Sequence, residues 1–350
     1  MDGSIDRMET TVKSLDQAAA VRWDDFVTGH AEGTFFHRAG WKRVIERTFR
    51  HDCHFLYAES AGAIIGVLPL VHVESRLFGN SLISTGFTVG GGPLVARVEA
   101  LARLEDRALE IADRLGVDFI EYRVRAPIHD DWTVKRNLYV GFEREIDPDP
   151  EKNLLAIPRK QRAMVRKGIK AGLESRIDAD TATAHRIYAV SVRNLGTPVF
   201  PRALFDNLAE VFGDDVDIVT ITKDGAAVAS VMSFYFRDRV LPYYGGGTRD
   251  ARAFAANDFM YWEVMRRAAE RGYRVFDFGR SKIGTGAFSF KKNWGFTPEP
   301  WTYEYKLRRI DHIPDINPLN PKYRLFIAAW KRLPVAVANL IGPRIVRGLG

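Results

Sequence analysis

The chain has 350 residues, of which 46% are hydrophobic and 27% are charged. This composition is typical of a folded protein of about two domains and excludes a chain that is mainly disordered. The single cysteine, Cys53, excludes an intramolecular disulfide and favours a reducing compartment. The first ten residues contain acids and no apolar run, so we expect no secretory signal and a cytoplasmic protein.

The formal net charge of +7 is unevenly distributed along the chain. Residues 157–176 hold seven Lys or Arg and one Glu, a local charge of +6. Residues 306–350 hold nine Lys or Arg and two Asp, a local charge of +7. Subtracting +6 and +7 from the total leaves −6 for the remainder. Two basic segments on an acidic body predict specific anionic partners.

The first half of the chain predicts helices and strands in alternation. In chain order we expect a helix over 38–49, strands over 54–57 and 64–73 with a turn at 60–62, a helix over 99–115, and strands over 117–124 and 138–142. Pro69 lies inside the second strand and favours an edge or bulged position there. Gly116 should end the second helix, because glycine commonly closes a helix in the left-handed conformation.

The second half repeats this order. We expect strands over 218–222 and 228–236 with a turn at 223–225, a helix over 258–271 and a strand near 275–278. The interval from Gly91 to Gly247 equals that from Gly116 to Gly272, since both are 156 residues. This regular offset predicts a tandem duplication of one α/β (α+β) unit with mixed sheets.

An acidic, proline-containing break at Asp147–Pro150 favours a domain boundary close to residue 150. We therefore expect a first domain over 1–150, a second over 151–310 and a basic, amphipathic C-terminal tail over 311–350. The tail over 323–350 could lie on the anionic inner face of a membrane or could pack as helices on the second domain. Trp330 on the lipid side would favour the membrane.

The stretch 272–296 predicts a strand, a glycine-rich turn and an aromatic segment with two adjacent lysines. Asp277 ends the strand and could remove a proton from an acceptor, although an aspartate here could equally cap the turn. Three further polar residues should point into the same crevice, namely Arg280, Ser281 and Lys282. The turn over 279–286 offers backbone N–H groups to an anion.

Lys291 and Lys292 lie among aromatic residues that include Trp294. An ammonium group among aromatic rings is partly desolvated, which strengthens its attraction to a phosphate or an oxyanion. Alternatively, such a lysine simply extends its charged end from an aromatic core. If this segment is extended, the two lysines point to opposite faces and only one can reach the site.

Two other segments carry candidate binding residues. In the helix that starts at Pro158, four cations share one face: Arg159, Arg162, Arg166 and Lys170. Val165 and Ile169 lie on another face and can pack inward. The cationic face is either a solvated surface or a site for a ligand with several phosphates, such as a nucleotide-linked acceptor, coenzyme A or a tRNA acceptor stem.

The segment with Tyr243, Tyr244 and three glycines centred on Gly246 could let a donor lie against the sheet, or could be a bulge. Asn257 and Asp258 are interpreted as the N-cap of the helix that follows, in preference to a substrate contact. His51, Cys53 and His54 are too close together for a standard zinc site and lack a fourth ligand nearby, so we expect no metal.

Several longer segments have a recognisable sequence: NDFMYWEVMRRAAERGYRVFDFGRSK with FKKNWGF, and PRKQRAMVRKGIKAGL, SVRNLGTPVFPR, LPYYGGGT and NPLNPKYRLFIA. Together these segments resemble FemAB-type transferases. The last four are similar to the branch associated with the PEP-CTERM/exosortase system of exopolysaccharide-producing Gram-negative bacteria. The resemblance implies two GNAT-like (acetyltransferase-like) domains and transfer of an acyl or aminoacyl group. It implies no permanent cofactor but a co-substrate, either an acyl-CoA, an acyl-carrier thioester or an aminoacyl-tRNA.

The resemblance also implies roles for residues. Lys291 would stabilise charge during transfer, and Arg162 and Arg166 would help to bind an anionic small-molecule or glycan acceptor of the cell envelope or exopolysaccharide pathway. The second half would hold the reacting groups and the first an acceptor-binding wall. The alternative is a non-catalytic module that binds an anionic glycan, a tRNA or an export-system partner.

Overall fold

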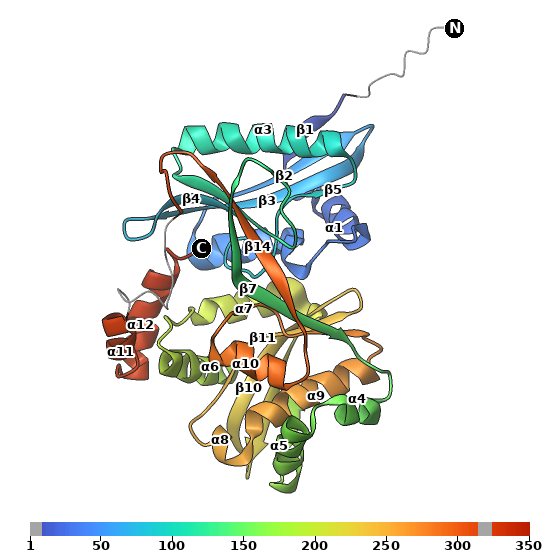
Figure 1. The fold of residues 1–350 in the computed structure, drawn as a ribbon, viewed down its shortest axis with the longest axis vertical. Coiled ribbons are helices and arrows are strands. Elements are labelled where there is room, and N and C mark those ends of the chain that lie inside the picture. The colour runs from blue at the N-terminus through green and yellow to red at the C-terminus, as the bar shows by residue number, and fades with distance from the viewer. Residues whose placement is uncertain (1–8, 314–323) are drawn as a thin grey trace. The chain divides into compact units, whose positions relative to one another are not determined.

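The structure, a computed structural model, describes residues 9–313 and 324–350. The expected tail over 311–350 and the segment NPLNPKYRLFIA at 317–328 therefore lie partly outside the described residues. Contacts divide the chain into two compact units. Unit 1 comprises the described residues of Met1–Lys135, Thr302–Pro314 and Gly348–Gly350, and unit 2 those of Arg136–Trp301 and Asp315–Arg347. The chain thus passes from one unit to the other more than once (Figure 1).

Unit 1 contains a sheet with the strand order β1-β2-β3-β4-β6-β14, and β5 also pairs with β3. Its strands are β1 (Thr11–Ser14), β2 (Cys53–Ser60), β3 (Ala63–Ser75), β4 (Gly79–Ser84), β5 (Leu94–Val95), β6 (Phe119–Val124) and the second part of β14 (Pro298–Leu307). Its helices are α1 (Ala20–Gly29), the 3-10 turn η1 (Phe35–His37), α2 (Ala39–Phe49) and α3 (Val98–Leu115). Every strand pair is antiparallel except β4 with β6, which is parallel.

Helices cover both faces of this sheet because neighbouring residues of a strand point to opposite sides. In β2, Phe55 stacks on Trp23 of α1, with ring centroids 5.6 Å apart. The next residue, Leu56, belongs to the apolar cluster that includes Leu104 of α3. α3 ends at Gly116, whose φ of 62° confirms the expected left-handed helix end.

Unit 2 contains a sheet with the strand order β7-β12-β11-β10-β9-β8, and β13 also pairs with β7. Its strands are β7 (Thr133–Glu145), which begins in unit 1, β8 (Glu174–Ile177), β9 (Val216–Lys223), β10 (Ala226–Phe236), β11 (Arg239–Gly247), β12 (Val275–Asp277) and β13 (Ser281–Lys282). Here only β11 and β12 are parallel among the pairs of the described sheet.

The helices of unit 2 also lie on two faces. They are α4 (Pro150–Ala156), α5 (Arg159–Lys170), α6 (Thr181–Leu195), α7 (Arg202–Phe212), the 3-10 turn η2 (Gly213–Asp215), α8 (Ala251–Phe254), α9 (Ala256–Glu270), α10 (Gly286–Asn293), α11 (Arg324–Trp330) and α12 (Val335–Val346). Met265 of α9 shares a buried apolar cluster with Val231 of β10. Tyr188 of α6 packs edge-on against Tyr244 of β11.

The two units confirm the predicted tandem duplication and the mixed sheets. The order β2-β3-β4-α3-β6 in unit 1 corresponds to β9-β10-β11-α9-β12 in unit 2, and each series ends in a parallel pair. Each unit then adds an antiparallel strand from the other half of the sequence: β14 beside β6, and β7 beside β12. The boundary expected near residue 150 falls within unit 2, after β7.

The position of Pro69 corrects one expectation. β3 is not an edge strand, because β2 pairs along one side and β4 and β5 pair along the other. The pairing with β4 extends to Leu70, that with β5 begins at Val67, and Pro69 lies between them. Its carbonyl accepts from the Thr85 N–H on this side. The missing N–H is tolerated because it faces the gap where the neighbouring strand changes.

Candidate active site in unit 2

The parallel strands β11 and β12 are paired at only two positions, Arg239 with Val275 and Val240 with Phe276. β11 then continues for seven residues to Gly247. After Asp277 the chain follows β7 instead, since Ser281–Lys282 pair with that strand as β13. In the described part of the chain, no strand pairs with the end of β11 on its β12 side. β11 therefore extends beyond its pairing with β12, as the strand beside a ligand-binding cleft does.

A β-bulge lies in the same part of β11. Met232 of β10 pairs with Tyr244 while the next residue, Ser233, pairs with Pro242. Tyr243 is therefore an extra residue, and its half-buried ring lies 5.2 Å from that of Phe234. Bulges turn a strand locally and are common beside active sites. The alternative that the three glycines form the bulge is wrong, because the bulge lies at Tyr243, two residues before Gly245, and the glycines pair in regular register with β10.

Packing within the protein accounts for the three glycines that follow. A Cβ at Gly245 would lie 2.8 Å from Val231, and one at Gly247 would lie 2.6 Å from the Asn257 Oδ1. A Cβ at Gly246 would overlap the Cβ of Ser191 on α6. Tyr244 is also buried, against rings of α6 and α7. The close approach at Gly246 is thus made by a helix, and a donor contact there stays a prediction.

We expect Gly246→Ala to lower the free energy of unfolding by about 1–3 kcal/mol, because neither the strand backbone nor the Ser191 Cβ can move away cheaply. Ser191→Gly should restore most of this loss in the double variant. Urea unfolding of the two single variants and the double variant measures the effect. If the losses of the two single variants add up in the double variant, α6 does not require a glycine at position 246.

Asp277 lies at the point where β11 and β12 separate. Its Oδ1 accepts from the Gly279 N–H at 2.7 Å, so the turn-capping contact is present. Burial raises the pKa of Asp277 to about 6; the Gly279 N–H opposes this shift, and Glu143, opposite it on β7, adds to it. A carboxyl with such a pKa can both lose and accept a proton near neutral pH. The turn contact therefore does not replace its candidate role as a base.

Lys291 lies in a helix and not in an extended segment. α10 begins after Thr285, whose hydroxyl accepts from the Phe288 N–H. Lys291 and Lys292 thus project about 100° apart. Lys291 is partly buried and its Nζ donates to the carbonyls of Gly279 and Arg280, at 3.3 and 3.0 Å, whereas Lys292 is exposed. Of the two lysines, Lys291 faces the turn.

The surroundings of Lys291 lower its pKa. Its Nζ lies 5.7 Å from the centre of the Phe142 ring. Burial lowers the pKa of Lys291 to about 8, and Arg280 contributes in the same direction, while Asp277 acts to raise it. The ammonium and the Asp277 carboxylate are therefore close enough to influence one another. This pair combines an acid with a raised pKa and a cation with a lowered pKa, a combination typical of functional sites.

The other residues of the turn have distinct surroundings. The guanidinium of Arg280 lies 4.1 Å from the centre of the Tyr139 ring. Ser281 is buried, and its hydroxyl has no hydrogen-bond partner among the described residues. Lys282 is half-buried in β13, where it pairs with Tyr139. The structure therefore brings Asp277, Arg280, Ser281, Lys282 and Lys291 together around one turn.

Sequence reasoning missed the ion pair beside Asp277. Arg239 at the start of β11 donates to Glu143 of β7 at 2.7 Å, and Glu143 lies opposite Asp277 in the sheet. Both groups act on the pKa of Asp277, Glu143 raising it and Arg239 lowering it. No local pattern indicates this pair, because the two residues are 96 positions apart.

Trp294 and Asp258 connect three helices of unit 2, α5, α9 and α10. Trp294 is fully buried, and its indole N–H donates to the Asp258 carboxylate at 3.0 Å. The same oxygen accepts from the Gln161 amide at 2.9 Å, so Asp258 links α10, α5 and α9. Burial raises the pKa of Asp258. Trp294 thus supports α10 from the core, and with no exposed surface it does not line a binding site.

The N-cap interpretation of Asn257 and Asp258 is wrong. α9 begins two residues earlier than expected, after Ala255, which has a φ of 55° and no side-chain cap. Asp258 lies in the first turn, and its side chain is used by Trp294 and Gln161. The sequence contained the polar residue that a cap needs, but the buried donors on other helices bind it instead.

The cations of α5 lie apart from the turn. Arg162 donates to the Leu155 carbonyl at 2.7 Å, and Arg166 is exposed. Neither residue contacts Asp277 or Lys291 among the described residues. Val165 is buried against α9 as expected, but Ile169 is 49% exposed, which corrects the expectation that both pack inward. The inner face of α5 is completed by Gly168, where a Cβ would lie 2.7 Å from Phe259.

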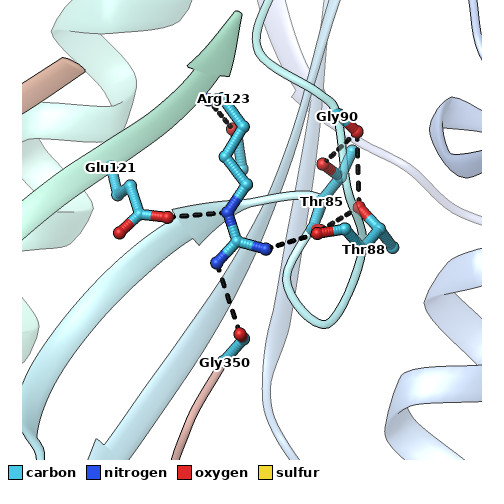
Figure 2. A network of polar contacts seen from close by, with 7 residues as sticks. Thr85, Thr88, Gly90, Glu121, Arg123 and Gly350 are labelled. Carbon is cyan, nitrogen blue, oxygen red and sulfur yellow. Dashed lines mark hydrogen bonds and ion pairs between the residues drawn. The ribbon is translucent and has the colours of Figure 1, made fainter. Parts of the chain in front are cut away.

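The corresponding place in unit 1 is closed. Glu121 is 156 positions before Asp277, and it forms a buried ion pair with Arg123 at 2.6 Å. Arg123 also donates to the carbonyls of Thr88 and Gly350 (Figure 2). Its own carbonyl accepts from the Gly91 N–H. The acid of unit 1 is therefore neutralised within the fold, and the loop over 85–92 lies along the strand end.

Comparison with known proteins identifies the domain. Residues 159–292 match the acetyltransferase (GNAT) domain family. The FemX crystal structure is similar with a TM-score of 0.65 and 15% identity, over 91% of this chain and 100% of that one. A tandem GNAT protein from the clavulanic acid biosynthesis pathway is similar with a TM-score of 0.55 and 13% identity, over 87% and 100%. The chain therefore has the fold of tandem GNAT proteins.

A third similar structure is the C-terminal domain of a putative lysylphosphatidylglycerol synthetase from Agrobacterium fabrum, with a TM-score of 0.54 and 14% identity, over 84% of this chain and 92% of that one. No curated protein matches the sequence. In the described residues no group of three or more His, Cys, Asp or Glu could hold a metal ion. No described helix is long and apolar enough to cross a membrane.

Proposed function

We propose that unit 2 transfers an acyl or aminoacyl group from an activated donor to an amine or hydroxyl acceptor. The observation that carries this proposal is the early separation of β11 from β12, with Asp277 and Lys291 at the point of separation. The match of residues 159–292 to a GNAT domain supports the same reaction class. Unit 1, whose equivalent acid is bound by Arg123, has no reacting group in this scheme.

The proposed step forms a bond between the acceptor nitrogen or oxygen and the carbonyl carbon, and it breaks the bond from that carbon to the donor's sulfur or oxygen. Asp277, ionised above a pKa of about 6, accepts the acceptor's proton. Lys291, charged below a pKa of about 8, stabilises the oxyanion together with backbone N–H groups of the turn over 279–286. The N–H groups of Gly279, Ile283 and Thr285 are not among these, because they donate within the protein. The proton finally goes to the leaving group, and both residues are in the required form between pH 6 and 8.

For the donor we propose an acyl thioester, either an acyl-CoA or an acyl-carrier thioester, with aminoacyl-tRNA as the competing class. GNAT domains use acyl-CoA, which favours the thioester. For the acceptor we propose an anionic molecule of the cell envelope or of exopolysaccharide synthesis. The acid-free cationic face of α5, on which Arg159, Arg166 and Lys170 are exposed, supports an anionic ligand. The envelope assignment derives from the resemblance of several segments to the PEP-CTERM/exosortase-associated FemAB branch.

Calorimetric titration of the full chain with acetyl-CoA, longer acyl-CoAs and a charged tRNA mixture, at low and high salt, tests the donor. We expect an acyl-CoA to bind with little dependence on salt. Binding of charged tRNA alone, with the steep salt dependence of phosphate contacts, would replace the thioester by the aminoacyl donor. Binding of neither class would exclude acyl-CoA and aminoacyl-tRNA as donors; an acyl-carrier thioester, titrated next, would then separate the transferase from a non-catalytic module.

A further inference from the structure

The two C-terminal helices are docked on unit 2 by their inner faces. Trp330 at the end of α11 is 2% exposed, so it does not face outward as a lipid anchor would. Ile327 lies against Gly196 at the end of α6, where a Cβ would lie 2.5 Å from its side chain. In α12, Gly342 lies against the Val199 backbone, where a Cβ would lie 2.7 Å from the nitrogen. The packed alternative for the tail is therefore present.

The outer faces of the same helices expose apolar side chains. Leu325 and Phe326 of α11 are 85% and 42% exposed. Val337 and Leu340 of α12 are 39% and 65% exposed. Val337, Leu340 and Arg344 follow at steps of three and four, so they form one stripe along α12. Docking on unit 2 does not account for this outer face, which we define by Leu325, Phe326, Val337 and Leu340.

Charge distinguishes this outer face from other parts of the surface. Residues 316–350 include six Lys or Arg and no Asp or Glu. At the chain's average of 44 acids in 350 residues, these 35 residues would contain about four acids. Lys331 and Arg332 follow α11, and Arg344 and Arg347 lie at the end of α12; all four are exposed. A segment with exposed apolar side chains and cations, and without acids, complements a surface that has an anionic outer layer over an apolar interior.

We propose that the outer face of α11 and α12 binds the surface of an anionic lipid bilayer. The apolar side chains would enter the headgroup region while the flanking cations contact lipid phosphates. Each cation near such a surface strengthens binding about fivefold, which compensates for the small apolar area. Four side chains on two short helices offer much less area than the roughly 800 Å² per partner of a stable protein interface. This inference is independent of the transfer reaction.

Co-sedimentation of the full chain with vesicles tests the proposal. We expect binding to vesicles that contain equal parts of phosphatidylcholine and phosphatidylglycerol, weaker binding at high salt, and little binding to phosphatidylcholine alone. Arg332→Glu with Arg344→Glu should lower the partition coefficient at least tenfold, and Leu325→Ser with Leu340→Ser should lower it severalfold. All four residues are exposed, so unfolding midpoints should not change.

Matched variants in unit 1 control for general charge and hydrophobicity. Arg103→Glu with Arg114→Glu makes the same charge change on α3, and Val21→Ser with Val98→Ser removes apolar side chains that are 72% and 81% exposed. We expect these variants to bind vesicles like the unchanged protein. Equal binding to both kinds of vesicle, binding to neither, or equal losses in control and tail variants would overturn the proposal.

Discussion

Lys291→Met should lower kcat for acyl transfer by about 10²–10³-fold, the usual cost of removing one oxyanion donor. Lys292→Met should leave kcat unchanged, because Lys292 is exposed and its neighbour alone faces the turn. The two variants remove the same charge from adjacent residues, so they separate a site effect from a change in net charge. Steady-state kinetics with the donor identified by titration measures both.

The division between kcat and KM distinguishes a catalytic role for Lys291 from a binding role. A residue that stabilises only the transition state changes kcat and leaves donor affinity nearly constant. The Met side chain also removes the hydrogen bonds to the Gly279 and Arg280 carbonyls, so unfolding of the variant must be measured in parallel. A loss confined to KM, or equal losses in the two lysine variants, would exclude the proposed role.

Asp277→Asn should lower kcat by about 10²–10⁴-fold and abolish the rise of kcat/KM with pH near pH 6. The same variant should be more stable than the unchanged protein at neutral pH. Burial raises the pKa of Asp277 above the usual 3.8, so the folded state carries the cost of an unfavourable charge. This prediction therefore couples a loss of activity to a gain of stability.

The sign of the pH dependence follows from proton binding. Below about pH 4 the Asp277 carboxyl is protonated in the folded and in the unfolded protein, so it makes no pH-dependent contribution to the free energy of unfolding. Between pH 4 and 6 the folded state retains more protons, so the free energy of unfolding falls as pH rises, by at most about 3 kcal/mol. Asp277→Asn should remove this fall in urea unfolding followed across the range. An unchanged pH profile would mean that burial does not perturb this group.

The elements of the fold could be predicted largely from local pattern. Helices expected over 38–49, 99–115 and 258–271 correspond to α2, α3 and α9, because apolar spacing and end signals are local features. The constant offset of 156 residues revealed the duplication. The placement of β7 beside β12 and of β14 beside β6 could not be predicted, because pairing over so long a sequence distance leaves no local signal.

The candidate site was predictable only where its chemistry is contiguous. Asp277, the following turn and Lys291 lie within fifteen residues and form one cluster in the structure. Gly246 illustrates the limit, since a glycine required by a neighbouring helix and one required by a ligand look the same in sequence. Asp258 resembled a helix cap because its two donors, Gln161 and Trp294, come from other helices.

Hydrogen–deuterium exchange with and without saturating donor tests most directly whether unit 2 holds the transfer site. We predict protection at residues 241–247 of β11 and 278–286 of the following turn. Residues 85–92 of unit 1 should be unaffected, because Arg123 and its partners already hold that loop. Protection at 85–92 without protection at 241–247, or no protection by any acyl-CoA, acyl-carrier thioester or charged tRNA, would contradict the account.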